Sequence, residues 1–204
     1  MKRIVLFTKY GSVNLLKNYY LDEVVALDDG IEIALENNIK LFLAISDFKD
    51  VSLDNLLKYI SKDKIMKYTK RDNESALDKV LNYLITLQCD EIIILDSFAY
   101  SLEHTQELLY VLKKYRIKIT ILSEKEAVSY YSVGSHVISK QGYSSFMLIG
   151  YPNCEISMEH VSQNISNIKL DFTNNLPLGN KIFERVAVLK VISGGVLLVL
   201  KNDD

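Results

Sequence analysis

Acidic side chains recur where short apolar segments of this chain end. Carboxylates from separate loops can together hold a divalent cation against phosphate oxygens. The residues at these positions are Asp28, Asp29, Asp47, Asp50, Asp96 and Glu103. The alternative is structural, because Asp is a favoured turn and helix-capping residue and any α/β protein has several at the starts of its loops. The residues alone leave both interpretations open.

A histidine follows one of these acids. His104 stands next to Glu103 in the expected first turn of a helix, where it either contacts a ligand or is a neutral polar residue on the surface. The surface interpretation is favoured, because the N-terminus of a helix disfavours a charged imidazolium. His136, beside Gly134 and Ser135, is expected to be a structural residue of a hairpin.

Glycine-rich phosphate-binding loops are absent from the sequence. There is no G-x-x-x-x-G-K-[ST], no G-x-G-x-x-G, no G-x-S-x-G and no H-E-x-x-H. A nucleotide would therefore have to be held through acidic residues and a bound Mg²⁺.

The elements that must position these acids are short apolar runs rich in branched side chains. Such runs predict strands covered on both faces, as in parallel sheets. They span residues 4–8, 24–27, 41–46, 91–95 and 117–122. Ligands of parallel sheets bind beyond the carboxyl ends of the strands, which is where the acids lie.

Helical periodicity separates these strands. Residues 75–87 carry one apolar stripe, composed of Leu77, Val80, Leu81, Leu84 and Leu87. Residues 101–115 are predicted to form a second helix with Ser101 as its cap and with Leu102, Leu109 and Leu112 on its apolar face. Strands that alternate with helices predict an open, mostly parallel, Rossmann-like sheet in three layers over residues 1–125, of the nucleotide-binding type.

The pattern changes near residue 125. Of the eight glycines only Gly11 and Gly30 precede residue 134, and both prolines follow residue 150. Period-two segments then follow, with turns expected at Gly134-Ser135 and at residues 193–195. The expected strands are 127–133, 136–139, 145–151, 165–172, 182–192 and 196–201. This spacing is typical of a small sandwich or barrel, and we predict an all-β sandwich domain over residues 126–204.

Composition excludes some partners. The net charge is −2 and lysines alternate with acids along the chain, so no basic face for nucleic acid is expected. Cys89 and Cys154 lack a C-x-x-C partner and are predicted to be reduced thiols. The apolar run before Lys9 is too short for a signal peptide or a membrane span, which predicts a cytoplasmic protein without a membrane partner.

The order of segments resembles the thiamine pyrophosphokinase family across almost the whole chain. Residues 26–30 (ALDDG) resemble its A-D-G-G motif and residues 45–50 (ISDFKD) its I-G-D-F-D-S motif. Residues 102–105 (LEHT) resemble L-D-H-T, and residues 134–143 (GSHVISKQGY) are close to G-S-H-T-I-S-K-x-G-Y, which is the most specific match.

The resemblance implies an activity and a set of site residues. Members transfer a pyrophosphoryl group from ATP to the hydroxyl of thiamine, giving thiamine diphosphate and AMP, with Mg²⁺ held by acidic residues. They are homodimers with sites between the α/β domain of one subunit and the β domain of the other. By position, the implied catalytic residues are Asp28, Asp47 and Glu103, and the implied metal ligands are Asp28, Asp47 and Asp50. The implied nucleotide-binding residues are Asp29, Gly30, Ser75 and His104, and the implied thiamine-binding residues are Ser135 and Glu184.

The chain departs from the family pattern at several acids. Lys49 replaces the second acid of I-G-D-F-D-S, and Asn73 and Ala76 stand where carboxylates are expected. Losing negative charges from a phosphoryl-transfer site removes electrostatic stabilisation of its transition state. Two hypotheses therefore remain: a divergent thiamine pyrophosphokinase, or a nucleotide- or thiamine-binding regulatory module without catalysis. Catalysis on a different acceptor alcohol is not separated from the first by sequence.

Overall fold

The computed structural model describes residues 2–19, 21–69, 75–171, 173–174 and 176–202, and of residues 176–179 it describes the backbone. The chain divides into two compact units, residues 1–124 and 125–204. We describe each unit by itself.

A parallel sheet forms the centre of the first unit. Its described strands are β1 (Arg3–Phe7), β2 (Glu23–Leu27), β3 (Leu43–Ser46), β4 (Ile65–Lys67), β5 (Glu91–Leu95) and β6 (Lys118–Leu122). They lie in the order β4-β3-β2-β1-β5-β6, and neighbouring strands pair in parallel. Every residue of β3 and β5 is buried, which explains their continuous apolar runs.

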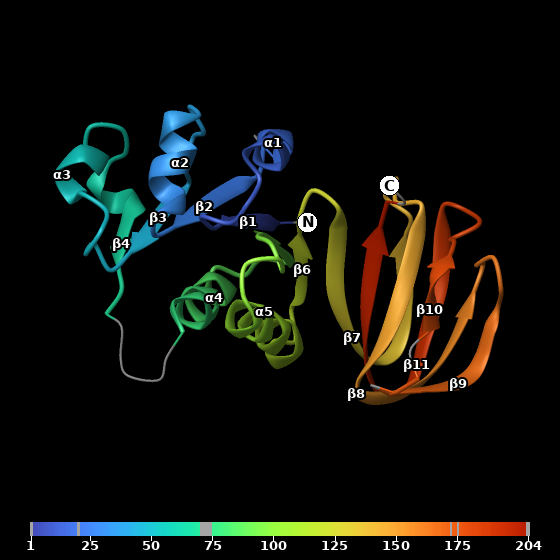
Figure 1. Cartoon of the computed structure of the whole chain (residues 1–204). Coiled ribbons are helices and arrows are strands. Elements are labelled where there is room, and N and C mark those ends of the chain that lie inside the picture. Colours follow the sequence, from blue (N-terminus) through green and yellow to red (C-terminus); the bar gives the residue numbers. More distant parts are fainter. Residues whose placement is uncertain (1, 20, 70–74, 172, 175, 203–204) are drawn as a thin grey trace. The chain divides into compact units, whose positions relative to one another are not determined.

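Helices cover both faces of this sheet, as predicted (Figure 1). On one face lie α1 (Val13–Leu16), α2 (Gly30–Glu36) and α3 (Leu53–Leu56), and on the other lie α4 (Ala76–Thr86) and α5 (Leu102–Lys114). Two short 3₁₀ turns, η1 (Lys17–Tyr19) and η2 (Lys62–Lys64), complete the described elements of this unit. The first unit is therefore a three-layer α/β fold.

The two longer helices begin at serine caps. The hydroxyl oxygen of Ser75 accepts a hydrogen bond from the amide of Asp78, and Ser101 caps α5 in the same way. The predicted apolar stripe of α4 is buried except at Leu87, which is half-buried. The predicted face of α5 is wrong in part: Leu102 is 76% exposed, and the buried residues are Leu108, Val111 and Leu112.

The second unit is an all-β structure of long antiparallel strands. They are β7 (Glu126–Ser139), β8 (Ser145–Glu159), β9 (Ile165–Asp171), β10 (Leu176–Asn180) and β11 (Val186–Lys201). Strand β11 pairs with β7 on one side and with β8 on the other, and both β9 and β10 pair with β8. These pairings establish antiparallel sheet, and the packing of two layers into a sandwich stays a prediction.

Two predicted hairpin turns are wrong. Gly134 and Ser135 lie inside β7, and residues 193–195 lie inside β11. The glycines serve strand irregularities there: the register of β11 shifts between Val191 and Gly195, and Gly194 has φ of +70°. Because a bulge and a turn call for the same glycine, the sequence signal was the same for both.

The remaining structural expectations concern thiols and membrane spans. Cys89 and Cys154 are both free, and burial raises the pKa of each thiol above its ordinary value. Within the described ranges, none of the helices has the length and apolar character needed to cross a membrane.

Candidate functional site

The strand order of the first unit reverses at β1. Strands β2, β3 and β4 follow on one side of β1, whereas β5 and β6 lie on its other side. Ligands of open α/β sheets bind in the crevice beyond the carboxyl ends of the strands at such a switch point. A cavity of about 200 Å³ opens there. Besides Lys9 and Tyr10, its lining includes the polar side chains of Thr8, Asp28, Asp96, His104 and Glu107.

Asp96, directly after β5, is the anchor of this cavity. It is 1% exposed and both of its carboxylate oxygens have partners. The Thr8 hydroxyl donates to Oδ2 at 2.7 Å, and Nε2 of His104 lies 2.7 Å from Oδ1. The amide of Ser97 also donates to Oδ1, at 2.6 Å. Asp96 therefore holds the imidazole ring in place rather than offering a free oxygen to a ligand.

The His104 side chain is 13% exposed and faces the cavity, so the favoured surface position is wrong. Its Nδ1 lies 3.7 Å from Oε2 of Glu107, one turn further along α5. Glu107 in turn accepts a hydrogen bond from the hydroxyl of Ser75, which caps α4. The ring of Tyr10, at 4.7 Å between centroids, packs against the imidazole. The histidine is fixed from several elements at once.

Asp28, directly after β2, has the least satisfied carboxylate of the cavity. Its Oδ2 accepts a hydrogen bond of 2.8 Å from the Tyr68 phenol, whereas its Oδ1 is buried without a hydrogen-bond partner in the described part of the chain. Tyr68 is 6% exposed. Burial, the bond to Asp28 and the nearby negative charges of Asp28, Asp47 and Asp29 raise the pKa of this phenol. Carboxylates from the loops after β2 and β3 thus influence the same group.

Two lysines pair with predicted acids near the strand ends: Lys9 lines the cavity, whereas Lys49, Asp29 and Asp47 are not among its lining residues. The Lys9 ammonium lies 3.2 Å from Oδ2 of Asp29, and the Lys49 ammonium lies 3.8 Å from Oδ2 of Asp47. The Lys49 side chain is 73% exposed, so it does not enter the cavity. The Asp47 side chain is 16% exposed, and its Oδ1 accepts a hydrogen bond from the amide of Lys49.

Comparison with known proteins identifies this architecture. No family model matches the sequence, and no curated protein matches it. Thiamine pyrophosphokinase from Bacillus subtilis, however, superposes over 100% of both chains with a TM-score of 0.84 at 17% identity. The chain has the thiamine pyrophosphokinase fold. The enzyme from Geobacillus thermodenitrificans superposes over 99% of this chain and 98% of its own, with a TM-score of 0.82 at 16% identity. The enzyme from Candida albicans superposes over 99% of this chain and 89% of its own, with a TM-score of 0.81 at 12% identity.

These similarities confirm the resemblance that the sequence motifs indicated, and at such low identity they establish the fold alone. In this thiamine pyrophosphokinase fold, Gly30 opens α2 and is buried against the end of β1. A Cβ atom on Gly30 would lie 2.9 Å from the carbonyl oxygen of Phe7, so the close approach of helix and strand requires glycine.

Other predicted residues lie away from the cavity lining. Glu103 and Asp50 are exposed, the first in α5 and the second in the loop after β3. Ser135 is exposed on β7 opposite Lys190, in the second unit. Glu184 is also exposed there, and its Oε1 lies 3.3 Å from Nδ1 of His160. The roles predicted for all four stay predictions.

Of the two positions before and at the start of α4 that depart from the family pattern, the structure describes one, Ala76. Ala76 lines the cavity, where the resemblance leads us to expect a carboxylate. Asn73 lies outside the described residues. Among the residues that are described, no three His, Cys, Asp or Glu side chains form a group that could hold a metal ion.

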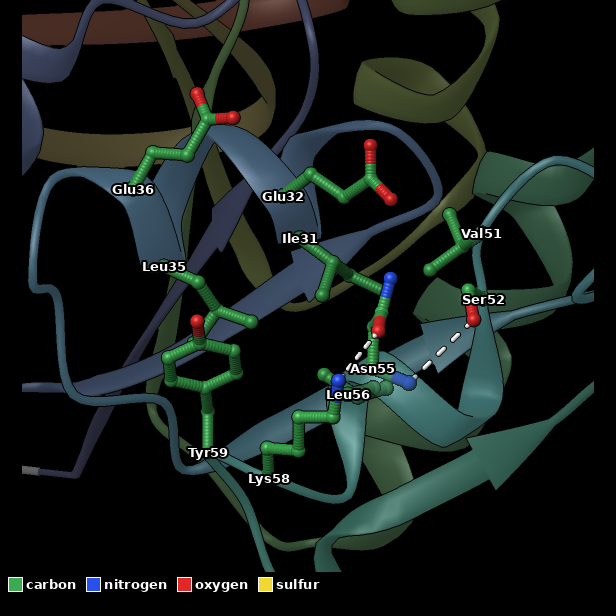
Figure 2. A pocket seen from close by; sticks show the side chains of 10 residues that line it. All are labelled: Ile31, Glu32, Leu35, Glu36, Val51, Ser52, Asn55, Leu56, Lys58 and Tyr59. Atoms are coloured by element: carbon green, nitrogen blue, oxygen red, sulfur yellow. Dashed lines mark hydrogen bonds between the residues drawn. The ribbon is translucent and has the colours of Figure 1, made fainter.

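A second cavity, of about 350 Å³, lies between α2 and the segment that contains α3 (Figure 2). Ile31 and Leu56 lie on its buried side, and Glu32, Glu36 and Tyr59 border it. None of the residues predicted for catalysis, metal, nucleotide or thiamine lines this cavity. We therefore place the candidate site at the strand ends.

Sequence reasoning missed Thr8, Tyr68 and Glu107. Thr8 could have been found, because it follows β1 directly and the carboxyl ends of parallel strands meet at one edge. Tyr68 follows β4, a strand of three residues that no apolar run revealed. Glu107 reaches the cavity from the second turn of α5, and no local pattern distinguishes it from a solvated helix residue.

Proposed function

We propose that the chain is a pyrophosphoryl transferase of the thiamine pyrophosphokinase type. It would transfer pyrophosphate from ATP to the hydroxyl oxygen of thiamine, giving thiamine diphosphate and AMP, with Mg²⁺. The observation that carries the proposal is the Asp28 carboxylate, which keeps one buried oxygen uncommitted at the switch point of this fold.

The residues fit Mg²⁺. This ion keeps several water molecules and is usually bound through one or two carboxylates together with substrate phosphates, so a preformed group of three protein ligands is not needed. In the proposal Asp28 supplies Oδ1, Asp47 supplies the second carboxylate, and Asp50 is the outer acid of the same edge. When bound, Mg²⁺ supplies neutralisation of the charge that develops on the transferring phosphates.

The triphosphate of ATP would be bound by Lys9, which lines the cavity, and by Lys49 in the loop after β3. Exposed ion pairs such as Lys9 with Asp29 and Lys49 with Asp47 contribute about 0–1 kcal/mol each. A polyanion can therefore take over these ammonium groups at little cost. His104, oriented by Asp96, would stand beside the phosphates.

The remaining nucleotide contacts in the proposal come from Asp29, Gly30 and Ser75, with Glu103 near the reacting phosphates. Thiamine would be bound by Ser135 and Glu184 from the second unit of a partner in a homodimer. This assignment rests on the motif resemblance and the fold.

The test is AMP formation from ATP at high protein concentration, with and without thiamine and Mg²⁺. We expect AMP to appear only when both are present. Asp28→Asn should reduce the rate by about 100-fold, because it removes one charge aimed at the transferring group. Asn tolerates the left-handed backbone of residue 28, where φ is 49°, so the variant should fold. Asp54→Asn, at an exposed position of α3, is the matched control and should keep full activity. Absence of AMP in every condition would refute the catalytic proposal.

A second candidate, nucleotide binding without turnover, is favoured by two observations. Ala76 puts a methyl group where a carboxylate is expected, and Lys49 places a cation 3.8 Å from Asp47. Both changes reduce the negative charge available to hold Mg²⁺. A ligand of the folded state raises its melting temperature. A melting temperature raised by ATP analogues, combined with no AMP formation, would favour this candidate.

A further inference from the structure

We propose that Tyr68 is a positioning residue: its phenol holds one oxygen of the Asp28 carboxylate and leaves the other, buried oxygen to bind a divalent cation. This inference rests on the proposed function, and it assigns a role to a residue outside the family motifs quoted above.

The phenol is itself firmly placed. Tyr68 follows β4 at the edge of the sheet, and its amide donates a hydrogen bond of 3.1 Å to the carbonyl oxygen of Ser46, at the end of β3. Its side chain is 6% exposed. From this buried position its hydroxyl reaches Oδ2 of Asp28 at 2.8 Å, across 40 residues of sequence.

The backbone of Asp28 is fixed as well. Its amide donates to the carbonyl oxygen of Ile45 at 3.0 Å, and its carbonyl oxygen accepts from the amide of Ile31 at 2.9 Å. The residue has φ of 49°, in the left-handed region. With the main chain held from two sides, rotation of the carboxylate is the freedom that remains, and the bond to Tyr68 restricts it.

The two oxygens of the Asp28 carboxylate differ in their hydrogen bonding, and this difference indicates a ligand. A buried carboxylate oxygen without a partner destabilises the folded state. Among the described residues, Oε2 of Glu23 is also buried without a hydrogen bond, but the Lys2 ammonium lies 3.4 Å from it. The neighbouring Asp96 has partners on both Oδ1 and Oδ2. In Asp28 the phenol satisfies Oδ2 while Oδ1 stays buried and unpartnered among the described residues. A cation at Oδ1 would complete the set.

Groups that orient a metal-binding carboxylate typically contribute 10- to 100-fold to metal affinity. We therefore test Tyr68→Phe, which removes only the hydroxyl. Tyr59→Phe is the matched control, because Tyr59 is 71% exposed and borders the other cavity. Binding of Mn²⁺, measured by electron paramagnetic resonance with a non-hydrolysable ATP analogue present, should weaken about tenfold in Tyr68→Phe and stay unchanged in Tyr59→Phe.

Kinetics supply a second readout that a merely structural role would not move. In Tyr68→Phe the Mg²⁺ concentration for half-maximal AMP formation should rise about tenfold, while kcat at saturating Mg²⁺ stays within about threefold of wild type. The double variant that combines Asp28→Asn and Tyr68→Phe should have the same Mn²⁺ affinity as Asp28→Asn alone, because the phenol acts only through Asp28.

The outcomes separate the two proposals. Equal Mn²⁺ affinity in Tyr68→Phe and wild type, with weaker binding in Asp28→Asn, would overturn the role of Tyr68 and leave the proposed function standing. No Mn²⁺ binding by wild type would overturn the cation site itself. If Tyr68→Phe fails to fold, the tyrosine absorbance of wild type and Asp28→Asn is measured instead. Adding Mg²⁺ and the analogue should give a tyrosine difference spectrum in wild type that Asp28→Asn lacks, and equal spectra would refute the inference.

Discussion

Replacing Thr8 with valine changes one hydroxyl to a methyl group in the lining of the cavity, and this hydroxyl makes two hydrogen bonds there. The Thr8 hydroxyl donates to Oδ2 of Asp96 at 2.7 Å, and it also accepts a hydrogen bond of 3.2 Å from the amide of Tyr10. Asp96 is 1% exposed, so water cannot replace the lost donor. Hydrogen bonds to charged groups contribute about 1.5–3 kcal/mol, so we expect Thr8→Val to lower the free energy of unfolding by about 2 kcal/mol.

Urea unfolding followed by circular dichroism at 222 nm measures this loss. The described helices all lie in the first unit, so their signal reports the unit that contains Thr8. With a urea dependence of about 2 kcal/mol per molar, the midpoint should fall by about 1 M. Thr86→Val is the matched control: its hydroxyl bonds to the carbonyl oxygen of Tyr83 on an exposed surface, and the loss should stay within about 0.5 kcal/mol. Equal midpoints for the two variants would show that the buried carboxylate does not depend on this donor.

Two further predictions concern stability. Gln88 follows α4 with φ of 54°, a left-handed conformation that glycine adopts more readily, so Gln88→Gly should raise the free energy of unfolding by about 1 kcal/mol. Gln106→Gly, inside α5, should lower it by about as much. Urea midpoints of the two variants that move in the same direction would contradict this. Burial and the hydrogen bond to Asp78 raise the pKa of the Tyr115 phenol, so its contribution to stability is complete below about pH 10 and is lost as pH rises further. Tyr115→Phe should therefore flatten the fall of the unfolding free energy between about pH 10 and pH 12, and an unchanged slope in alkaline urea titrations would refute the assignment.

The parallel sheet was predictable because its signal is local. Apolar runs such as 91–95 are buried along their whole length, and the structure has strands at each run predicted in the first unit. Strand β4 was missed because Ile65–Lys67 has three residues and none of them is buried. The short helices α1 and α3 escaped for a related reason: four residues make one turn, which is too short to display a period.

In the second unit the strands were predictable but their continuity was not. Gly134 in β7 and Gly194 in β11 carry the same local signal as hairpin turns. What distinguishes a bulge from a turn is pairing on both sides of the glycine. The pairs Val191 with Gly134 and Gly195 with Ser132 supply this, over more than 50 residues of sequence.

In the candidate site, too, the positions of the acids were predictable from sequence but their hydrogen bonding was not. That Asp28, Asp47 and Asp96 lie at one edge follows from sheet geometry, because each comes directly after a parallel strand. Which of their carboxylate oxygens are hydrogen-bonded does not follow from sequence, because the donors are distant along the chain. Thr8 is 88 residues from Asp96, and Tyr68 is 40 residues from Asp28. Type and spacing therefore locate the acids, whereas long-range hydrogen bonds determine which acid keeps a free oxygen. For the same reason a motif with an altered acid does not by itself decide whether the chain can bind a cation.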